Sequence, residues 1–312
     1  MTDVANARNG VLLMTYGSPA SPDDVGRYLA AVRGGRAAEP ELVAEFRGRY
    51  ELIGGSPLIP ITIAQAAALE RHLGDGTVAR AGMRFSDPSI ETALRDLAAG
   101  GVTAVAAIIM SPQFSPLLMG GYARAVEAAL GAIGTGAPSV QVAGAWYREP
   151  AFVAAVARRI EESLAVMRRV GHGDVPVLLT AHSLPRRVAD EEPAYLDQLR
   201  ESAELIAGAA GLERPRWSFC WQSAGHEPGE WMTPDFADLM PELRDAGRRS
   251  VLVAPIQFLA DHLEILYDVD VGARAQAEAA GLEFRRIASL NDDPQFIEAL
   301  AAVARRTVDV SA

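Results

Sequence analysis

Short apolar runs alternate with longer amphipathic stretches along most of this sequence. Four runs are apolar enough to predict strands buried on both faces, at 11–14, 102–110, 177–180 and 251–254. The stretches between them carry the start signals and apolar spacing of helices. Helices are predicted from Ser21, from Pro40, and at about 64–74, 89–99, 120–132, 150–168, 192–210, 235–247 and 293–308.

Strand–helix alternation is typical of βαβ units and parallel sheets. The alternation runs through two halves of similar length, with a break near 144–149. We therefore predict an α/β fold of two doubly wound lobes, 1–145 and 146–312, which face one another across a cleft. Ligands of such sheets bind beyond the carboxyl ends of the strands.

Length and charge restrict the class of protein. A chain of 312 residues exceeds the size at which one core usually stops growing, which favours two lobes. The net charge of −11 excludes nucleic acid as an expected partner, because phosphate binding needs a basic face. All 29 basic residues are arginines, which excludes a Schiff-base lysine, a pyridoxal-phosphate enzyme and a Walker-type phosphate loop.

Cysteine content and hydropathy bear on the compartment. Cys220 is the one cysteine, so the chain forms neither an internal disulfide nor a cysteine-ligated iron–sulfur cluster. The N-terminus lacks an apolar signal core, and no window approaches 18 uninterrupted apolar residues. We expect a cytoplasmic protein that is monomeric and makes at most peripheral contact with a membrane.

Two segments carry the most chemistry. His182 follows an apolar strand directly, which places it at a ligand-binding edge; a purely structural histidine is the alternative. Asp261, Glu264 and Asp268 have the spacing that puts three carboxylates on one face of an α-helix. Such a stripe indicates a bound cation or a general base, and mutual repulsion would raise the pKa of one member; a solvated acidic face is the alternative.

The turn after the first strand holds a further candidate. Tyr16 ends that strand and would point its phenol into the cleft, unless it only covers the edge of the sheet. No G-x-G-x-x-G follows the strand, which counts against a dinucleotide enzyme.

Taken together, seven segments resemble the ferrochelatase family, in the family's order. They are MTYGSP (14–19), YLAAVRGGR (28–36), FRGRYELIGGSPL (46–58), MSPQFS (110–115), TAHSLP (180–185), WQSAG…PGEW (221–231) and FLADHLEILYD (258–268). The resemblance is strongest to the short coproporphyrin III ferrochelatases of monoderm type. It implies two Rossmann-like lobes of the class II chelatase kind, with a porphyrin cleft between them.

The resemblance also implies a reaction and roles for particular residues. The chain would insert Fe²⁺ into a porphyrin in haem biosynthesis, with coproporphyrin III preferred and protoporphyrin IX possible. His182 and Glu264 match the family's metal-binding, proton-accepting pair. The positions that match the porphyrin site are Tyr16, Arg33, Arg49, Tyr50, Ser56 and Tyr122.

The chain departs from the family pattern at two positions. Gly34 replaces the second arginine of a frequent pair, and Gly272 stands where the family's acidic ridge often continues with a glutamate. Some members carry a [2Fe–2S] cluster, which one cysteine cannot support, so we expect no cofactor beyond the substrate Fe²⁺.

Three alternatives to iron insertion stay open at this stage. A related class II chelatase would insert cobalt or nickel into an early tetrapyrrole. A porphyrin or haem carrier would need Tyr16 and the arginines but not the acidic stripe. A nucleotide-dependent α/β enzyme would need the glycine-rich phosphate motifs that are missing here.

Overall fold

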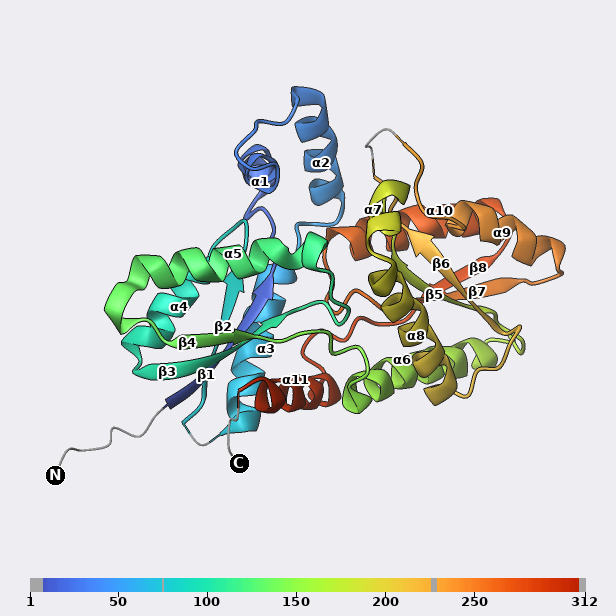
Figure 1. Ribbon diagram of the computed structural model, residues 1–312. Helices are drawn as coiled ribbons and strands as arrows, with labels where there is room; N and C mark the ends of the chain where they lie inside the picture. Colours follow the sequence, from blue (N-terminus) through green and yellow to red (C-terminus); the bar gives the residue numbers. More distant parts are fainter. Residues whose placement is uncertain (1–7, 75, 226–228, 309–312) are drawn as a thin grey trace. The chain divides into compact units, whose positions relative to one another are not determined.

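The computed structural model describes residues 8–74, 76–225 and 229–308 (Figure 1). The chain forms two compact units. Unit 1 comprises 1–112, 116–149 and 291–312, and unit 2 comprises 113–115 and 150–290. Each unit is described by itself below.

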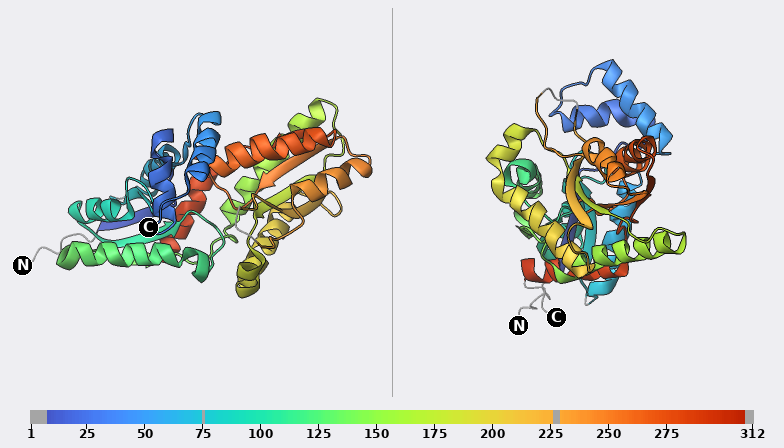
Figure 2. Two further views of the ribbon diagram at one scale, coloured as in Figure 1. Left: turned by 90° about the horizontal axis from the view of Figure 1, so that it is seen from above. Right: turned by 90° about the vertical axis from the view of Figure 1, so that its right-hand side faces the viewer.

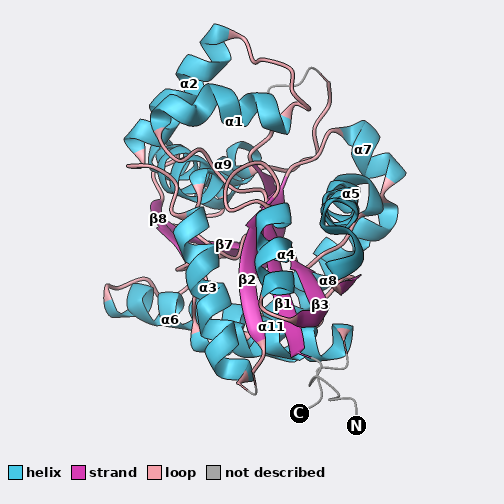
Figure 3. Cartoon of the chain, turned by 90° about the vertical axis from the view of Figure 1, so that its left-hand side faces the viewer, coloured by secondary structure: helices cyan, strands magenta, loops and turns pink. Residues whose placement is uncertain are grey.

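Among the described residues, unit 1 is built on a parallel sheet of four strands in the order β2-β1-β3-β4. The strands are β1 (Arg8–Thr15), β2 (Val78–Met83), β3 (Val102–Ile109) and β4 (Ser139–Val142). The three strands β2, β1 and β3 lie side by side in Figure 3. Residues 11–14 of β1 and 105–108 of β3 are completely shielded from solvent, because helices cover both faces of these central strands.

The helices of unit 1 begin and end at residues that suit those positions. Ser89 caps α4 by accepting the N–H of Thr92 at 3.0 Å, and Asp293 caps α11 by accepting the N–H of Gln295. The helices are α1 (Val25–Val32), α2 (Pro40–Leu52), α3 (Leu58–Leu73), α4 (Ile90–Ala99), α5 (Pro116–Ile133) and α11 (Pro294–Thr307). The pairs α3 with α11 and α4 with α5 pack together.

Unit 2 repeats this plan, with a four-stranded parallel sheet in the order β6-β5-β7-β8 in its described part. The strands are β5 (Val177–His182), β6 (Trp217–Gln222), β7 (Ser250–Pro255) and β8 (Glu283–Arg286). The helices are α6 (Pro150–Arg169), α7 (Arg186–Glu191), α8 (Pro193–Ala209), α9 (Phe236–Asp245), the π-helix η3 (Glu264–Ala273) and α10 (Arg274–Ala279). The π-helix runs directly into α10, and the two form one continuous rod in Figure 2.

The predicted α/β class with two parallel sheets is confirmed, but the structure divides the chain differently from 1–145 and 146–312. The C-terminal helix α11 belongs to unit 1, where it packs against α3 and β3. Phe296 on this helix is fully buried and stacks on Trp146, with ring centroids 6.3 Å apart. The predicted boundary placed this helix in the second lobe because the helix follows that lobe along the chain. Nothing in its amphipathic pattern specifies which sheet it covers.

The strand order determines where each unit can bind a ligand. In both sheets the second strand lies on one side of the first strand, and the third strand lies on its other side. The crossover helices of these two connections therefore lie on opposite faces of the sheet. Ligands of open α/β sheets bind beyond the carboxyl ends of the strands at this reversal. In unit 2 that position is next to the ends of β5 and β7. No helix in the described part of the chain has both the length and the apolar character needed to cross a bilayer.

Candidate active site

His182 is the last residue of β5, at the reversal point of the unit 2 sheet. Its Nδ1 lies 2.6 Å from the carbonyl oxygen of Ser183. A carbonyl oxygen only accepts hydrogen bonds, so Nδ1 carries the proton and the Nε2 lone pair of the neutral ring stays available. The backbone holds His182 in the tautomer that a metal ligand or a proton acceptor requires.

The segment that follows β7 adds a carboxylate and a second imidazole. Oε1 of Glu264 lies 3.8 Å from Nε2 of His182, and Oε2 of Glu264 lies 3.6 Å from Nε2 of His262. His262 repeats the arrangement of His182, because its Nδ1 donates to the carbonyl of Ala260 at 2.9 Å. One carboxylate therefore lies between two imidazoles that both turn their Nε2 atoms toward it.

The ring of Phe258 packs beside both imidazoles. Its centroid lies 6.3 Å from that of His182 and 4.9 Å from that of His262. This apolar ring shields one side of the pair from water. The three polar side chains are still 30% (His182), 38% (Glu264) and 18% (His262) exposed, so the site is open to a substrate.

The predicted stripe of three carboxylates is wrong at Asp261. The segment from Glu264 to Ala273 is a π-helix, and Asp261 lies before its first residue. Asp261 precedes the helix and is bound elsewhere: it accepts a hydrogen bond of 2.7 Å from Ser289 and pairs with Arg286. The imidazoles of His182 and His262 are the neighbours that face the Glu264 carboxylate.

The pKa of Glu264 is consequently lowered, to about 2, and not raised as the stripe suggested. Burial alone would raise this pKa, but once the imidazoles are protonated the positive charge of His182 and the hydrogen bond and charge of His262 outweigh it. The carboxylate is thus ionised at neutral pH, and it can stabilise a cation better than it can store a proton. Within the described residues, no group of three or more His, Cys, Asp or Glu side chains is arranged so that it could hold a metal ion.

Two consecutive hydrogen bonds connect the backbone of His182 to α8. Oε1 of Gln257 accepts the backbone N–H of His182 at 2.8 Å, and Nε2 of Gln257 donates to the hydroxyl of Tyr195. Tyr195 lies on α8 and is almost fully buried. The position of His182 is therefore fixed by α8 as well as by the strand.

Unit 1 places an aromatic cluster at the carboxyl end of its own sheet. Tyr16 follows β1 and is 44% exposed, and its ring centroid lies 5.2 Å from that of Phe85 and 5.9 Å from that of Tyr122. The guanidinium of Arg84 lies over all three rings, at 4.6–5.6 Å from their centroids. Burial and the neighbouring Tyr16 raise the pKa of the Tyr122 phenol, although Arg84 opposes the shift.

The remaining predicted porphyrin-site residues lie on or beside α1 and α2. Arg33 is the exposed residue at the end of α1, and Ser56 lies between α2 and α3. Arg49 is mostly buried on α2, where it pairs with Glu45 at 2.5 Å and lies over the ring of Phe46. Tyr50 beside it is 5% exposed and contributes to the core. The structure brings Tyr16 and Tyr122 together and places the other four on this helical segment.

Sequence reasoning missed four residues of these two regions: His262, Gln257, Arg84 and Arg286. His262 lay inside the quoted DHLE segment, and its position two residues before Glu264 was the available signal. The other three had no signal, because a glutamine or arginine after a strand is common on protein surfaces. Residues 226–228 of the quoted segment 221–231 lie outside the described residues.

The chain is similar to known proteins over nearly its whole length. The ferrochelatase family matches residues 8–308. A ferrochelatase of Deinococcus radiodurans is 37% identical over 311 residues, with 98% of each chain covered. A coproporphyrin III ferrochelatase of Bacillus subtilis is 36% identical over 308 residues, with 96% of this chain and 98% of the relative covered.

Solved structures show the same fold at much lower identity. The sirohydrochlorin chelatase SirB from Bacillus subtilis subspecies spizizenii, in complex with cobalt, has a TM-score of 0.54 at 14% identity, with 97% of this chain and 96% of that chain covered. This likeness concerns the fold alone. The family match and the two relatives, which each cover nearly the whole chain, show that the protein is an enzyme of the ferrochelatase family.

Proposed function

We propose that this protein inserts Fe²⁺ into coproporphyrin III, with His182 and Glu264 handling the metal and the protons. His262 joins this pair as the second imidazole. The proposed porphyrin-binding residues are Tyr16, Arg33, Arg49, Tyr50, Ser56 and Tyr122. The single observation that supports the proposal most strongly is the Glu264 carboxylate between two imidazoles whose Nδ1 atoms are both held by carbonyl oxygens.

The reaction exchanges one metal ion for two protons. A free-base porphyrin carries two pyrrole N–H groups, and both protons must leave as Fe²⁺ enters to give the neutral iron porphyrin. Each imidazole can accept one proton at its free Nε2, which accounts for both. A base of this kind typically contributes about 10²–10⁴-fold to a rate.

Glu264 has a different task from the one that the predicted acidic stripe suggested. With a pKa of about 2 it stays ionised at neutral pH. A fixed carboxylate beside Nε2 of His182 favours either the incoming Fe²⁺ or the imidazolium that forms when a pyrrole proton arrives. The proton acceptors in our proposal are therefore the histidines, and Glu264 provides the compensating charge.

Iron suits this set of ligands. Imidazole is a good ligand for Fe²⁺, and the carboxylate adds a negative charge beside it. We propose that the chain uses no cofactor beyond the substrate Fe²⁺. The partial exposure of His182 and Glu264 supports a site from which the metal is passed on to the porphyrin.

On the porphyrin side, propionates need cationic forks or hydroxyl groups. The guanidiniums of Arg33 and Arg49 supply the first, and the hydroxyls of Ser56 and Tyr122 the second. Tyr16 presents an exposed phenol at the carboxyl end of β1. We further propose that the protein acts in the cytoplasm as a monomer, with at most peripheral contact with a membrane.

An anaerobic assay tests the proposal. Purified protein is mixed with Fe²⁺ and, in separate reactions, with coproporphyrin III, protoporphyrin IX and sirohydrochlorin, and the Soret band is followed. We expect the fastest metallation with coproporphyrin III. Preference for protoporphyrin IX would overturn the proposed substrate, and metallation of sirohydrochlorin alone, or only with Co²⁺ or Ni²⁺, would overturn the proposed reaction.

A further inference from the structure

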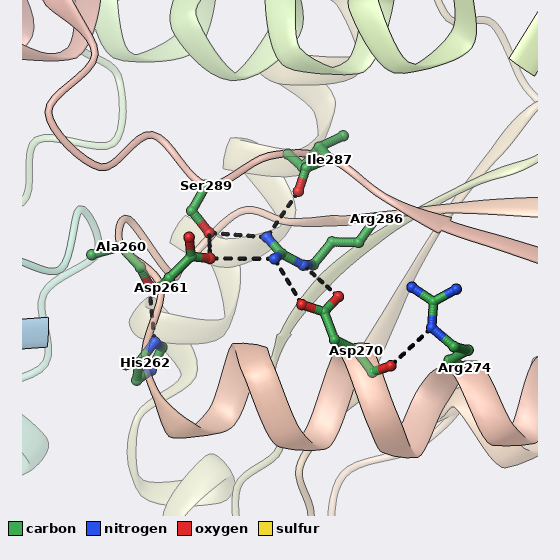
Figure 4. A network of polar contacts seen from close by, with 8 residues as sticks. All are labelled: Ala260, Asp261, His262, Asp270, Arg274, Arg286, Ile287 and Ser289. Carbon is green, nitrogen blue, oxygen red and sulfur yellow. Dashed lines mark hydrogen bonds and ion pairs between the residues drawn. The ribbon is translucent and has the colours of Figure 1, made fainter. Parts of the chain in front are cut away.

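Arg286 is the last residue of β8, and its guanidinium lies at the centre of a polar network behind the candidate active site (Figure 4). Nε and Nη2 donate to the two carboxylate oxygens of Asp270, each at 2.8 Å, in a bidentate pair. Nη1 donates to the carbonyl of Ile287 at 2.9 Å and to the hydroxyl of Ser289 at 3.0 Å. The side chain is only 12% exposed.

The same guanidinium reaches a second carboxylate. Nη2 lies 3.3 Å from Oδ1 of Asp261, and the hydroxyl of Ser289 donates to that oxygen at 2.7 Å. Figure 4 shows Asp261 and Asp270 converging on Arg286 from two different parts of the chain. The first precedes the π-helix, and the second lies on it.

In the sequence, these two carboxylates lie on either side of His262 and Glu264. Asp261 is the residue immediately before His262, and Asp270 lies on the π-helix that begins at Glu264. Between the two anchor points the backbone changes from a loop to a π-helix, a rare helical form that depends on its surroundings. The orientation of His262 and Glu264 therefore depends on how both ends of the segment 261–270 are held.

The geometry points to Arg286 as a positioning residue for iron insertion, one that holds His262 and Glu264 in their facing arrangement by binding Asp261 and Asp270 at the same time. This inference rests on the proposed function, because it assigns Arg286 a role in that reaction. In the network drawn in Figure 4, dashed lines join Arg286 to the two carboxylates, and none joins it to His262.

Electrostatics indicate why one cation serves both anchors. Without Arg286, two carboxylates would be left close together and largely shielded from water, and they would repel one another. Asp261 would then move away, and His262 would move with it because the two residues are adjacent. Misplacing a catalytic group by about 1 Å costs on the order of 10²-fold in rate, so a small shift is sufficient to be measured.

The first test compares Arg286→Met with Arg286→Lys and with the control Arg285→Met. Arg285 is the neighbouring residue on β8 and is exposed, so its substitution leaves the network intact. With Fe²⁺ and coproporphyrin III, we expect Arg286→Met to lower kcat by about 10- to 100-fold while KM for the porphyrin changes less than about twofold. Arg286→Lys keeps the charge but not the bidentate fork, and we expect an intermediate kcat.

The second test approaches the network from the other side. Asp261→Asn removes the charge that Arg286 binds while keeping the size of the side chain, and we expect kcat to fall and KM for the porphyrin to stay unchanged. The double variant Asp261→Asn, Arg286→Met should be no slower than the slower single variant. This test decides the matter if Arg286→Met fails to fold.

The outcomes separate the inference from the proposed function. If wild-type protein metallates coproporphyrin III but Arg286→Met or Asp261→Asn retains wild-type kcat, the positioning role is wrong. It is also wrong if only KM for the porphyrin changes. If the wild-type protein metallates no porphyrin, the proposed function fails. The visible absorption of bound Co²⁺ then tests the positioning role by itself. Identical spectra for wild-type and Arg286→Met overturn that role, and a changed intensity supports it.

Discussion

Nε2 of His182 lies 3.8 Å from Oε1 of Glu264, although His182 ends β5 and Glu264 begins the π-helix that follows β7. The parallel order of β5 and β7 brings them together, because the chain leaves both strands at the same edge. Their separation is larger than a hydrogen bond and leaves room for a cation that both atoms contact.

The first prediction concerns His182→Ala. Removing the imidazole takes away a metal ligand and a proton acceptor, so we expect the rate of iron insertion to fall by about 10²–10⁴-fold. Porphyrin affinity, measured by quenching of tryptophan fluorescence, should stay close to that of the wild-type protein. Metallation is measured from the Soret band under anaerobic conditions.

His172→Ala is the matched control for this prediction. His172 pairs with Glu283 at the surface, 2.8 Å away, and its loss should leave insertion unchanged. A wild-type rate of insertion in His182→Ala would mean that His182 takes no part in the reaction. The alternative of a porphyrin carrier would then explain the site better than catalysis.

The second prediction concerns Glu264 and pH. Its pKa in the folded protein is about 2, against an ordinary value of 4.5, so folding favours the ionised form. The resulting stabilisation is present above about pH 4.5 and is lost as the pH falls toward 2. Because the side chain is 38% exposed, solvent screens the interaction, and we expect a contribution of no more than about 1 kcal/mol.

The comparison of wild-type protein with Glu264→Gln measures this contribution. Urea unfolding of both proteins between pH 6 and the lowest pH at which they stay folded should show the stability advantage of the wild type shrinking with acid. An advantage that grows as the pH falls would mean that the pKa of Glu264 is raised, as the carboxylate stripe predicted. Glu264→Gln should also slow iron insertion at neutral pH, because an amide cannot balance the charge of Fe²⁺ or an imidazolium.

The four strands predicted from apolar runs correspond to β1, β3, β5 and β7, which are the central strands of the two sheets. Their residues are buried on both faces, so the sequence there is almost continuously apolar. The strands that were missed, β2, β4, β6 and β8, are the edges, and they include polar residues such as Arg80, Gln141 and Arg285. Local patterning reports burial, so it finds central strands and overlooks edges.

The site shows a similar division. His182 and Glu264 were predictable because each stands in a distinctive segment after a buried strand. The π-helix was not, since its onset at Glu264 depends on long-range contacts such as those of Arg286 with Asp270. Because the helix was predicted to include Asp261, that residue was placed beside Glu264, and the direction of the Glu264 pKa shift was predicted wrongly. The partners of a side chain, and hence its charge state, are set by the tertiary fold.

The third prediction concerns the fit of Arg84 against α5. A Cβ at Gly121 would overlap the guanidinium of Arg84, so Gly121→Ala must push that group away from Tyr16 and Tyr122. Gly120→Ala is a matched control, because its Cβ would make only one contact, 3.3 Å from Arg124. Both substitutions gain up to about 1 kcal/mol of helix propensity. Gly121→Ala should lose about 0.5–2 kcal/mol of cation–π stabilisation in addition.

A double-mutant cycle with Arg84→Met isolates this effect. Once the guanidinium is absent, we expect Gly121→Ala to be as favourable as Gly120→Ala, as measured by urea unfolding. If Gly121→Ala costs the same stability with and without Arg84, the clash is with something other than the guanidinium. The same cycle followed by porphyrin titration would show whether the cluster around Tyr16 contributes to binding.

The last prediction concerns α11 and the extent of unit 1. Phe296 is fully buried on this helix and stacks on Trp146, so Phe296→Ala should cost about 3–5 kcal/mol. Since α11 packs on α3 and β3, hydrogen exchange should accelerate in β1 and β3 before it does so in β5 and β7. Phe236→Ala, in the core between β6 and α9 of unit 2, should produce the reverse order. If Phe296→Ala accelerates exchange in β5 and β7 alone, the C-terminal helix belongs to the second lobe. If it accelerates exchange equally in both sheets, the two units do not unfold separately. The contrast between the two variants thus tests whether α11 belongs with the sheet of unit 1.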